Sequence, residues 1–422
     1  MGANFTWVMI GCALIGAGAS AVGVFSFLRK QALVGDAIAH SLLPGVALAF
    51  IIGGEKSIWV LFPGAFIAGW LSILSIEFIT KSSKIKPDTA IAIVLTVFFG
   101  IGIVMLTHIQ QSSYGNQSGL EDFLFGKAAA MLPSDIALFA IVDLVLISSI
   151  ALTYPYLKLY SFDPEYSRAI GLPVRFIQFT LSSLTVLAVA SGIQAVGVVL
   201  MSALIITPAA AARFFTSRLS QMIILAMLIG LVSAVGGVYI SSLAFKMPTG
   251  PWVVMILSIL AISAFVFAPS KGMVSRYNKR KEHQLKVRSE NLLKLFFKLE
   301  EKGESNHFSR TELLNHRKFE GRDLETILKS LLGKRLLARS QDSFSLTEEG
   351  REEATRVVRI HRLWELYLNK RMSIAADHVH HDAEAIEHII TPELEQELLK
   401  DLGYPELDPH KQEIPGTKNL KP

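Results

Sequence analysis

The chain has 422 residues, of which 51% are hydrophobic and 18% are charged, and its formal net charge is +5 at pH 7. The single cysteine, Cys12, excludes an intramolecular disulfide framework and a thiolate-rich zinc site. No Gly-x-x-x-x-Gly-Lys-Ser/Thr pattern occurs, so we expect this chain to bind no nucleotide through a phosphate-binding loop.

Charged residues are distributed very unevenly along the chain. Residues 1–269 hold only 13 of the 41 Lys and Arg residues and 10 of the 36 Asp and Glu residues. The shorter remainder holds the other 28 and 26. We therefore interpret residues 1–269 as a membrane domain and the remainder as a region that lies in water.

The first part contains about nine apolar segments that predict membrane-spanning helices, because a hydrocarbon core of roughly 30 Å requires about 20 mostly apolar residues per helix. The second segment is short and contains Pro44 and Gly45, so we expect it to be broken or tilted. A tight junction at Ser191–Gly192 separates the sixth from the seventh. The expected spans are Phe5–Leu28, Ile38–Ile52, Ile58–Thr80, Thr89–Thr107, Ser134–Thr153, Phe176–Ser191, Ala195–Phe215, Leu219–Ala244 and Pro251–Pro269.

The Lys and Arg residues near the span ends predict the orientation, since inner loops of membrane proteins carry an excess of these residues. With the N-terminus outside, the outer loops hold only Lys56, Lys127 and Lys246. We therefore expect a multi-pass protein of the bacterial inner or plasma membrane, with its C-terminal part in the cytoplasm. The inner loops then hold Arg29, Lys30, Lys81, Lys84, Lys86, Lys158, Arg168, Arg175, Arg213 and Arg218.

The start of the second span carries an ionisable pair. Asp36 and His40 are four residues apart and therefore share one helical face. Such a pair is costly within a membrane unless it meets a partner, a water-filled path or an ion. A carboxylate with an imidazole suits manganese, iron or zinc. The spacing alone also allows the alternative that Asp36 lies at the start of the helix and that His40 is an interior histidine whose ring nitrogens are hydrogen-bonded.

A short polar helix is predicted between two spans on the inner face. Asp163 and Pro164 mark its start, Gly171 marks its end, and Glu165 and Arg168 lie within it. Such a helix offers a binding surface to a cytoplasmic ATPase, and by spacing alone it fits an inert connector equally well.

The soluble part begins with a basic linker, residues 270–288, which fits binding to lipid headgroups. Residues 289–350 are expected to form a winged helix-turn-helix, with helices at Ser289–Glu301, Arg310–Leu314 and Gly321–Leu337 and a hairpin at Ala338–Leu346. Residues 351–415 are expected to form a helical metal-binding and dimerisation domain, followed by a tail, residues 416–422. Its helices are expected at Glu348–Lys370, His378–Ile390 and Pro392–Leu402.

The helical domain carries a dense group of imidazole and carboxylate side chains. Helical spacing places two of them on one face of the helix at 348–370 and four on one face of the helix at 378–390. Two facing helices of this kind can hold one or two ions without a thiolate, and a solvated polar face is the alternative. The six residues are His361, Glu365, His380, Glu384, Glu387 and His388.

The membrane part resembles the permeases of the manganese, zinc and iron ABC importer family. The resemblance rests on Ala32–Ser41, Asp163–Gly171 and Ser202–Arg213, and extends from Leu14 to Pro269. It implies a helical bundle that forms a homodimer or a heterodimer, binds two cytoplasmic ATPase subunits and receives metal from an extracytoplasmic binding protein. It also implies that Asp36 and His40 are ligands on the transport path and that the segment from Asp163 to Leu172 couples to the ATPase, where ATP is hydrolysed.

Residues from Ser289 to Pro415 resemble metal-dependent repressors of the diphtheria-toxin-repressor and manganese-regulator family. The resemblance rests on Glu290-Asn291, the segments 299–303, 346–350 and 361–363, Glu387-His388, and the segment 402–405 with Asp408-Pro409-His410. It implies ligands at His361, Glu384, Glu387 and His388, with Glu365 and His380 as further candidates. Glu384 stands where some members have a cysteine, which favours manganese, followed by zinc or iron.

Two departures from that family concern the first helix and the DNA-binding helix. The family takes further ligands from the first helix, where this chain has Asn291 and Lys294, and an ammonium group would repel an ion. The predicted recognition helix offers Arg322, Lys329 and Lys334 for DNA phosphates but few base-reading side chains. We therefore expect the tail to sense metal or to support dimerisation. The alternative is a membrane-tethered, metal-dependent transcription regulator.

Overall fold

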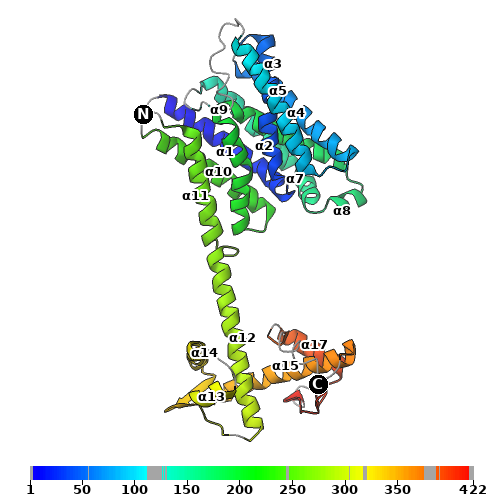
Figure 1. The fold of residues 1–422 in the computed structure, drawn as a ribbon, viewed down its shortest axis with the longest axis vertical. Helices are drawn as coiled ribbons and strands as arrows, with labels where there is room; N and C mark the ends of the chain where they lie inside the picture. The colour runs from blue at the N-terminus through cyan, green and yellow to red at the C-terminus, as the bar shows by residue number, and fades with distance from the viewer. Residues whose placement is uncertain are drawn as a thin grey trace. The chain divides into compact units, whose positions relative to one another are not determined.

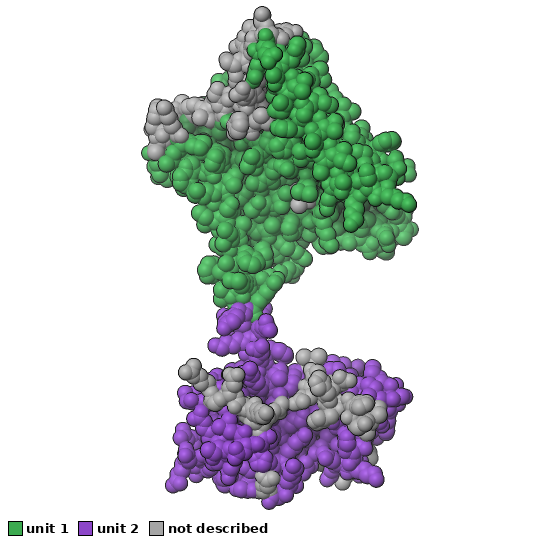
Figure 2. Space-filling model, in the orientation of Figure 1, with its two compact units in different colours: residues 1–276 green, residues 277–422 purple. Residues whose placement is uncertain are grey.

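The computed structural model describes residues 3–55, 57–111, 126, 128, 131–243, 247–303, 305–316, 321–374, 386–388 and 390–417. The chain forms two compact units, residues 1–276 and residues 277–422 (Figure 2). The regular secondary structure in the described part of unit 1 consists of helices alone, whereas unit 2 combines helices with a small sheet.

Eight helical stretches of unit 1, in the part that the structure describes, are long and apolar enough to cross a membrane. The helices α2 and α3 together make one of these stretches, and the short helix α8 is not among them. The helices are α1 (Ala3–Leu28), α2 (Ala32–Ser41), α3 (Leu43–Gly53), α4 (Ile58–Ser82), α5 (Pro87–Gln111), α7 (Pro133–Phe162), α8 (Pro164–Ala169), α9 (Val174–Phe215), α10 (Leu219–Ser241) and α11 (Thr249–Phe267).

Helix α1 forms the centre of unit 1 and packs against α7, α9 and α10, while α3, α4 and α5 lie side by side (Figure 1). Glycines permit these close crossings. A Cβ atom at Gly23 would lie 1.7 Å from the carbonyl oxygen of Ile205 in α9, and one at Gly16 would lie 2.8 Å from that of Gly230 in α10. The backbones of α1, α9 and α10 therefore approach one another where no side chain intervenes.

The second expected span is broken, as predicted. Leu42 separates α2 from α3, and Pro44 lies in the first turn of α3, where its missing N–H leaves no hydrogen bond unmade.

The expected separation of a sixth and a seventh span is present, because α9 joins two helices across a kink, but its expected place at Ser191–Gly192 is wrong. Both residues lie within α9, and the Ser191 hydroxyl donates to the carbonyl oxygen of Ala188 at 2.9 Å, so this polar group is satisfied without a break. The helix departs from helical geometry at Gly197 instead, where φ is +81° and ψ is 168°. Glycine tolerates this conformation because it has no Cβ.

Unit 2 contains a winged helix-turn-helix, as predicted. The strand order is β1-β3-β2, with antiparallel pairing of Phe308 with Phe344 and of Leu337 with Leu346. Its core is built on Leu292, Phe296 and Leu324, which are almost fully buried. The elements are α12 (Met273–Glu301), β1 (Phe308–Ser309), α13 (Arg310–His316), α14 (Gly321–Gly333), β2 (Leu337–Ser340), β3 (Ser343–Leu346), α15 (Glu348–Met372) and α17 (Pro392–Leu402).

Several elements of unit 2 differ from the expected ones. Helix α12 begins at Met273, so most of the basic segment 270–288 is helical, and α14 ends at Gly333 because Leu337 already belongs to β2. The short strand β1 was not expected from the sequence. Most of the helix expected at residues 378–390 lies outside the described residues.

Candidate metal sites and coupling segment

The ionisable pair of the membrane unit lies on α2 against α9. The Ser202 hydroxyl of α9 lies 2.8 Å from Oδ1 of Asp36, and Nε2 of His40 lies 3.7 Å from the same oxygen. The spacing of Asp36 and His40 therefore places both side chains on one face, as predicted, and the fold adds Ser202. Metal–ligand bonds of about 2.1 Å hold two ligand atoms roughly 3 to 4 Å apart, which is the separation of this pair.

This pair is only partly covered. The side chain of Asp36 is 41% exposed and that of His40 is 27% exposed. The second ring nitrogen of His40, Nδ1, is buried and has no hydrogen-bond partner among the described residues, while the ring packs edge-on against Phe99 at 5.2 Å between centroids. The arrangement presents a carboxylate and an imidazole nitrogen to an open side within an otherwise apolar unit.

Other carboxylates of the membrane unit serve contacts within it. Glu77 accepts hydrogen bonds from Lys81 at 2.8 Å and from Gln178 at 2.7 Å. Asp135 accepts one from the backbone N–H of Leu132 at the start of α7. Asp143 is buried against α1 and approaches Gly18 so closely that a Cβ there would lie 1.8 Å from its Oδ1. These contacts give the three carboxylates packing or helix-end roles.

The expected coupling segment forms α8. Asp163 caps this helix by accepting from the backbone N–H of Tyr166 at 2.9 Å, with Pro164 in the first turn. Gly171, with φ of +82°, follows its end. Ser167 is buried, and its hydroxyl donates to the carbonyl oxygen of Asp163 within the same helix. The outer side of the segment exposes Glu165, Arg168, Tyr166 and Ile170.

The tail brings together four of its six expected ligand residues. His361 Nε2 lies 3.0 Å from Oε1 of Glu365, and His361 Nδ1 contacts Oε2 of Glu387. His388 contacts Oε1 of Glu387 at 3.4 Å through Nε2, and its Nδ1 lies 2.6 Å from Oε2 of Glu290 in α12. All these side chains are buried or nearly so. The other two expected ligands, His380 and Glu384, lie outside the described residues.

A lysine ammonium group occupies the centre of this tail cluster. Nζ of Lys294 in α12 lies 2.9 Å from His361 Nδ1 and 2.9 and 3.1 Å from the two carboxylate oxygens of Glu387. These are charge-assisted hydrogen-bond distances, and they occupy the ligand atoms that an ion would need. The described residues of this cluster therefore do not fit a divalent ion.

The charges of the cluster agree with that arrangement. Burial by itself lowers the pKa of His361, but hydrogen bonds with Glu365 and Glu387 raise it, and the net shift is upward. Burial raises the pKa of Glu387, whereas the hydrogen bond with His361 and the charge of Lys294 lower it, and the net shift is downward. Glu387 is thus held as a buried carboxylate next to a buried ammonium group.

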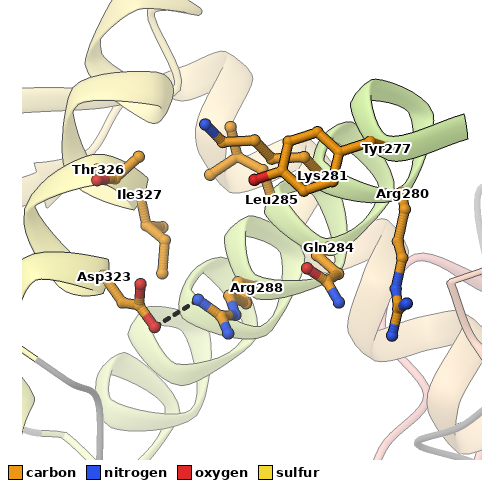
Figure 3. Close-up of a pocket in the computed structure, with 9 residues that line it drawn as sticks. All are labelled: Tyr277, Arg280, Lys281, Gln284, Leu285, Arg288, Asp323, Thr326 and Ile327. Carbon is orange, nitrogen blue, oxygen red and sulfur yellow. Dashed lines mark hydrogen bonds and ion pairs between the residues drawn. The ribbon is translucent and has the colours of Figure 1, made fainter. Parts of the chain in front are cut away.

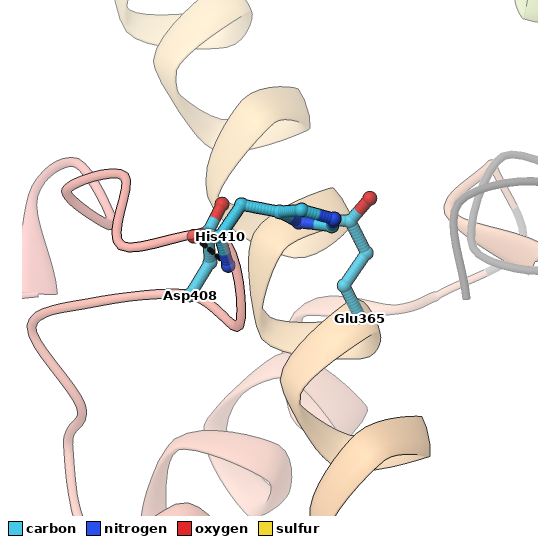
Figure 4. Close-up of side chains that lie close together, drawn as sticks. All are labelled: Glu365, Asp408 and His410. Carbon is cyan, nitrogen blue, oxygen red and sulfur yellow. Dashed lines mark hydrogen bonds and ion pairs between the residues drawn. The ribbon is translucent and has the colours of Figure 1, made fainter. Parts of the chain in front are cut away.

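A second group of tail side chains does fit a metal ion. One ligand atom each from Glu365, Asp408 and His410 lies within 4.8 Å of the others (Figure 4). Glu365 and Asp408 are buried, and His410 is exposed. Asp408 Oδ1 also accepts from the backbone N–H groups of His410 and Gln412 at 2.8 Å, which fixes the loop. Two carboxylates and an imidazole suit manganese, iron or zinc.

The sequence analysis found only one member of this second group, Glu365. Asp408 and His410 lie more than forty residues further along the chain, so helical spacing gives no sign of the contact. The Asp408-Pro409-His410 segment, which carries part of the repressor resemblance, was the available signal.

One of the predicted DNA-contacting side chains forms an ion pair within its own helix. Lys329 pairs with Glu325 at 2.9 Å on α14, and this hydrogen bond lowers the pKa of Glu325. Lys334 is exposed just after α14, and the side chain of Arg322 is not among the described ones. A neighbouring carboxylate on the same face opposes an approaching phosphate.

The other face of α14 turns toward α12. There Asp323 forms an ion pair with Arg288. A cavity of about 470 Å³ lies between the two helices (Figure 3). It is lined by Tyr277, Arg280, Lys281, Gln284, Leu285, Arg288, Asp323, Thr326 and Ile327.

Comparison with known proteins relates both parts of the chain to metal-handling proteins. Residues 2–268 match the family model of the ABC 3 transport family, and residues 347–416 match that of the iron dependent repressor, metal binding and dimerisation domain. The manganese transport system membrane protein MntC of Bacillus subtilis is 38% identical over 375 residues, which cover 88% of this chain and 86% of that protein. The zinc transport system membrane protein TroC of Treponema pallidum is 37% identical over 278 residues, 66% of this chain and 93% of that protein.

Among solved structures, PsaBC from Streptococcus pneumoniae in complex with Fab superposes with a TM-score of 0.59. The sequences are 32% identical, and the alignment covers 67% of this chain and 96% of that one. Its extent corresponds to the membrane unit, where the family model also matches. The chain is therefore a multi-pass membrane protein that belongs to the ABC 3 transport family of metal-transport permeases, with a repressor-like domain at its C-terminal end.

Proposed function

We propose that this chain is the permease subunit of a bacterial importer that takes up manganese in preference to zinc or iron. The observation that carries this proposal is the partly exposed group of Asp36 and His40 on α2 with Ser202 on α9. A carboxylate and an imidazole in an apolar unit favour a divalent cation of this series as the transported substrate. The Bacillus subtilis relative is a manganese transport system membrane protein, which supports manganese as the substrate, and the Treponema pallidum relative is a zinc transport system membrane protein, which supports zinc.

We propose partners for this subunit on both sides of the membrane. We propose that the exposed side of α8, with Tyr166 and Arg168, binds a cytoplasmic ATPase subunit, which hydrolyses ATP. Such a contact requires α8 to face the cytoplasm. If the two parts of α9 on either side of the kink at Gly197 cross the membrane separately, the N-terminus lies outside and the tail inside the inner membrane. An extracytoplasmic metal-binding protein delivers the ion, and a second permease, identical or different, completes the transport path.

Purified transporter in liposomes tests this proposal. Initial manganese uptake is measured with ATP inside, for the wild-type chain and for Asp36→Ala/His40→Ala. We expect ATP-dependent uptake that the double substitution reduces to background. Uptake by the double variant at the wild-type rate would contradict the assigned path.

The tail is proposed to sense the imported ion on the cytoplasmic side. The group Glu365, Asp408 and His410 supports this proposal, because one ligand atom of each lies within 4.8 Å of the others, with the guanidinium of Arg362 3.9 Å from Oδ2 of Asp408. The test compares uptake at low and high internal manganese for the whole chain and for a chain cut after Ser275. We expect high internal manganese to slow uptake only with the whole chain, and equal slowing of both would contradict a sensing role.

A membrane-tethered, metal-dependent transcription regulator is the second candidate function, and the winged helix-turn-helix of unit 2 favours it. The pairing of Lys329 with Glu325 counts against it. Electrophoretic mobility shifts of the whole chain in detergent, with the promoter DNA of its own operon, separate the two. We expect no shift beyond that given by unrelated DNA, and a specific shift would support the regulator.

A further inference from the structure

Lys294 has the surroundings of a buried structural cation. Its side chain is 6% exposed, and that of Glu387 is 0% exposed. The ammonium contacts both oxygens of Glu387 and the Nδ1 atom of His361 at 2.9 to 3.1 Å. The two carboxylate oxygens of Glu387 accept hydrogen bonds from the ammonium, and Nδ1 of His361 lies within hydrogen-bond distance of it.

The cation joins three separate segments of unit 2. Lys294 belongs to α12, His361 to α15, and Glu387 to the described segment 386–388. Two of these segments meet again where His388 contacts Glu290 of α12 at 2.6 Å. The described groups that face the ammonium are one carboxylate and one imidazole, with Glu365 bonded to the far side of that imidazole. Without the ammonium, the buried carboxylate of Glu387 would keep only imidazole contacts, those with His361 and His388, and would lose its permanently charged partner, which is unfavourable.

A divalent ion at the same point would have to displace the ammonium. The ion needs the lone pairs of Glu387 and His361, and both already face Nζ of Lys294. Two cations within about 3 Å repel each other strongly in a buried site. The ammonium is also tethered to α12 by its own side chain, so its occupancy does not depend on the concentration of any ion.

We propose that Lys294 is a built-in cation that takes the place of a metal ion between α12, α15 and residues 386–388, and so holds unit 2 in one arrangement whatever the metal supply. This inference goes beyond the proposed transport function and does not depend on it. It restricts any metal response of the tail to other positions, such as the group Glu365, Asp408 and His410. The winged-helix part, which contains α12, is then joined to α15 permanently rather than on metal binding.

Hydrogen exchange of the whole chain in detergent, followed by mass spectrometry, tests this inference. The reporter is the α12 peptide of residues 289–299, measured with a chelator and with saturating manganese. Every chain carries His410→Ala, so that a manganese effect reports the Lys294 position rather than the neighbouring group. The variants are Lys294→Met and Lys294→Gln, which remove the charge, and the matched control is Lys302→Met, which removes an exposed one.

With the native lysine, and with Lys302→Met, we expect equal exchange of this peptide in chelator and in manganese. In chelator, both neutral variants should exchange roughly tenfold faster or more, because the buried carboxylate lacks its partner. Manganese should slow this exchange again. Exchange of a peptide that covers residues 324–331 of α14 reports whether each variant remains folded. If one of the two neutral variants is unfolded, the inference is tested with the other.

Three results would overturn the inference. The first is a response of the lysine-containing chain to manganese at residues 289–299. The second is slow exchange of a folded neutral variant in chelator, and the third is fast exchange of that variant that manganese leaves unchanged. Because uptake of metal is not measured, failure of this inference is distinct from failure of the transport proposal.

Discussion

The hydroxyl of Ser202 lies 2.8 Å from Oδ1 of Asp36 and thereby joins α9 to α2 beside His40. The same hydroxyl lies 2.9 Å from the carbonyl oxygen of Val198 in its own helix. Its position is fixed by α9, which departs from helical geometry five residues earlier at Gly197. The bend in α9 therefore lies close to the proposed transport site.

Replacement of Ser202 tests the role of that contact. Ser202→Ala removes one hydrogen bond to the Asp36 carboxylate, and a hydrogen bond to a charged group contributes about 1.5 to 3 kcal/mol, so we expect the initial uptake rate to fall roughly tenfold or more. The matched control is Ser148→Ala, because the Ser148 hydroxyl bonds only to carbonyl oxygens of its own helix α7, those of Leu144 and Val145. Equal rates for the two variants would argue against a role of Ser202 in orienting Asp36.

The exposed face of α8 gives a prediction about the ATPase. Tyr166→Ala removes a 54% exposed aromatic side chain from the proposed contact, and we expect ATPase binding to weaken about tenfold, as for a central interface residue. Tyr239→Ala, at a 49% exposed tyrosine of α10, should leave binding unchanged. Affinity is measured by titrating the purified ATPase onto the permease in nanodiscs. A similar loss with both variants would show that α8 is not the specific contact.

Two arginines of α15 differ in burial, and we therefore expect their replacement to change the stability of the tail by different amounts. Arg362 is 2% exposed and pairs with Glu301 at 2.7 Å, whereas Arg371 is 55% exposed and pairs with Asp401 at the same distance. Arg362→Met leaves neighbouring acceptors unpaired, so we expect the tail to lose about 3 to 5 kcal/mol. Arg371→Met should cost little, because an exposed ion pair is screened by solvent.

The comparison of Arg362→Met with Arg371→Met is made by urea titration of the whole chain, with hydrogen exchange of residues 357–368 as the readout. A smaller shift of the unfolding midpoint for Arg362→Met than for Arg371→Met would contradict the arrangement around Arg362.

The crossing of α1 and α9 makes Gly23 a sensitive position. Gly23→Ala places a Cβ 1.7 Å from the carbonyl oxygen of Ile205, so the helices must separate, which costs roughly 1 to 3 kcal/mol. Gly100→Ala in α5 meets nothing within 4 Å and should be neutral or slightly stabilising. The thermal unfolding midpoint of the membrane unit in detergent measures the difference, and equal midpoints would refute the close crossing.

Most of the membrane architecture could be predicted because apolar length alone requires a spanning helix. The error at Ser191 and Gly192 has a physical cause. A Ser-Gly pair is typical of a turn in water, but in this bundle the backbone groups at Ser191 and Gly192 stay bonded within the helix, which continues as far as the kink at Gly197. The departure occurs at Gly197, where no sequence pattern distinguishes it from neighbouring glycines.

The candidate sites were predictable only where their residues share a helix. Asp36 and His40 are four residues apart, so their common face followed from spacing, but Ser202 is reached only through packing of α9 on α2. Likewise, the sequence showed that position 294 is a lysine, whose ammonium group opposes the binding of a metal ion. Only the fold shows that its ammonium lies between His361 and Glu387.

Cellular accumulation of manganese, iron and zinc by elemental mass spectrometry tests the central claim most directly. Cells express the whole transporter with the wild-type chain, with Asp36→Ala/His40→Ala, or with Asp135→Ala as a control carboxylate outside the proposed path. We predict that manganese accumulates with the wild-type and control chains and that the double substitution abolishes this at equal membrane expression. Accumulation that is indifferent to the double substitution would contradict metal passage at Asp36 and His40.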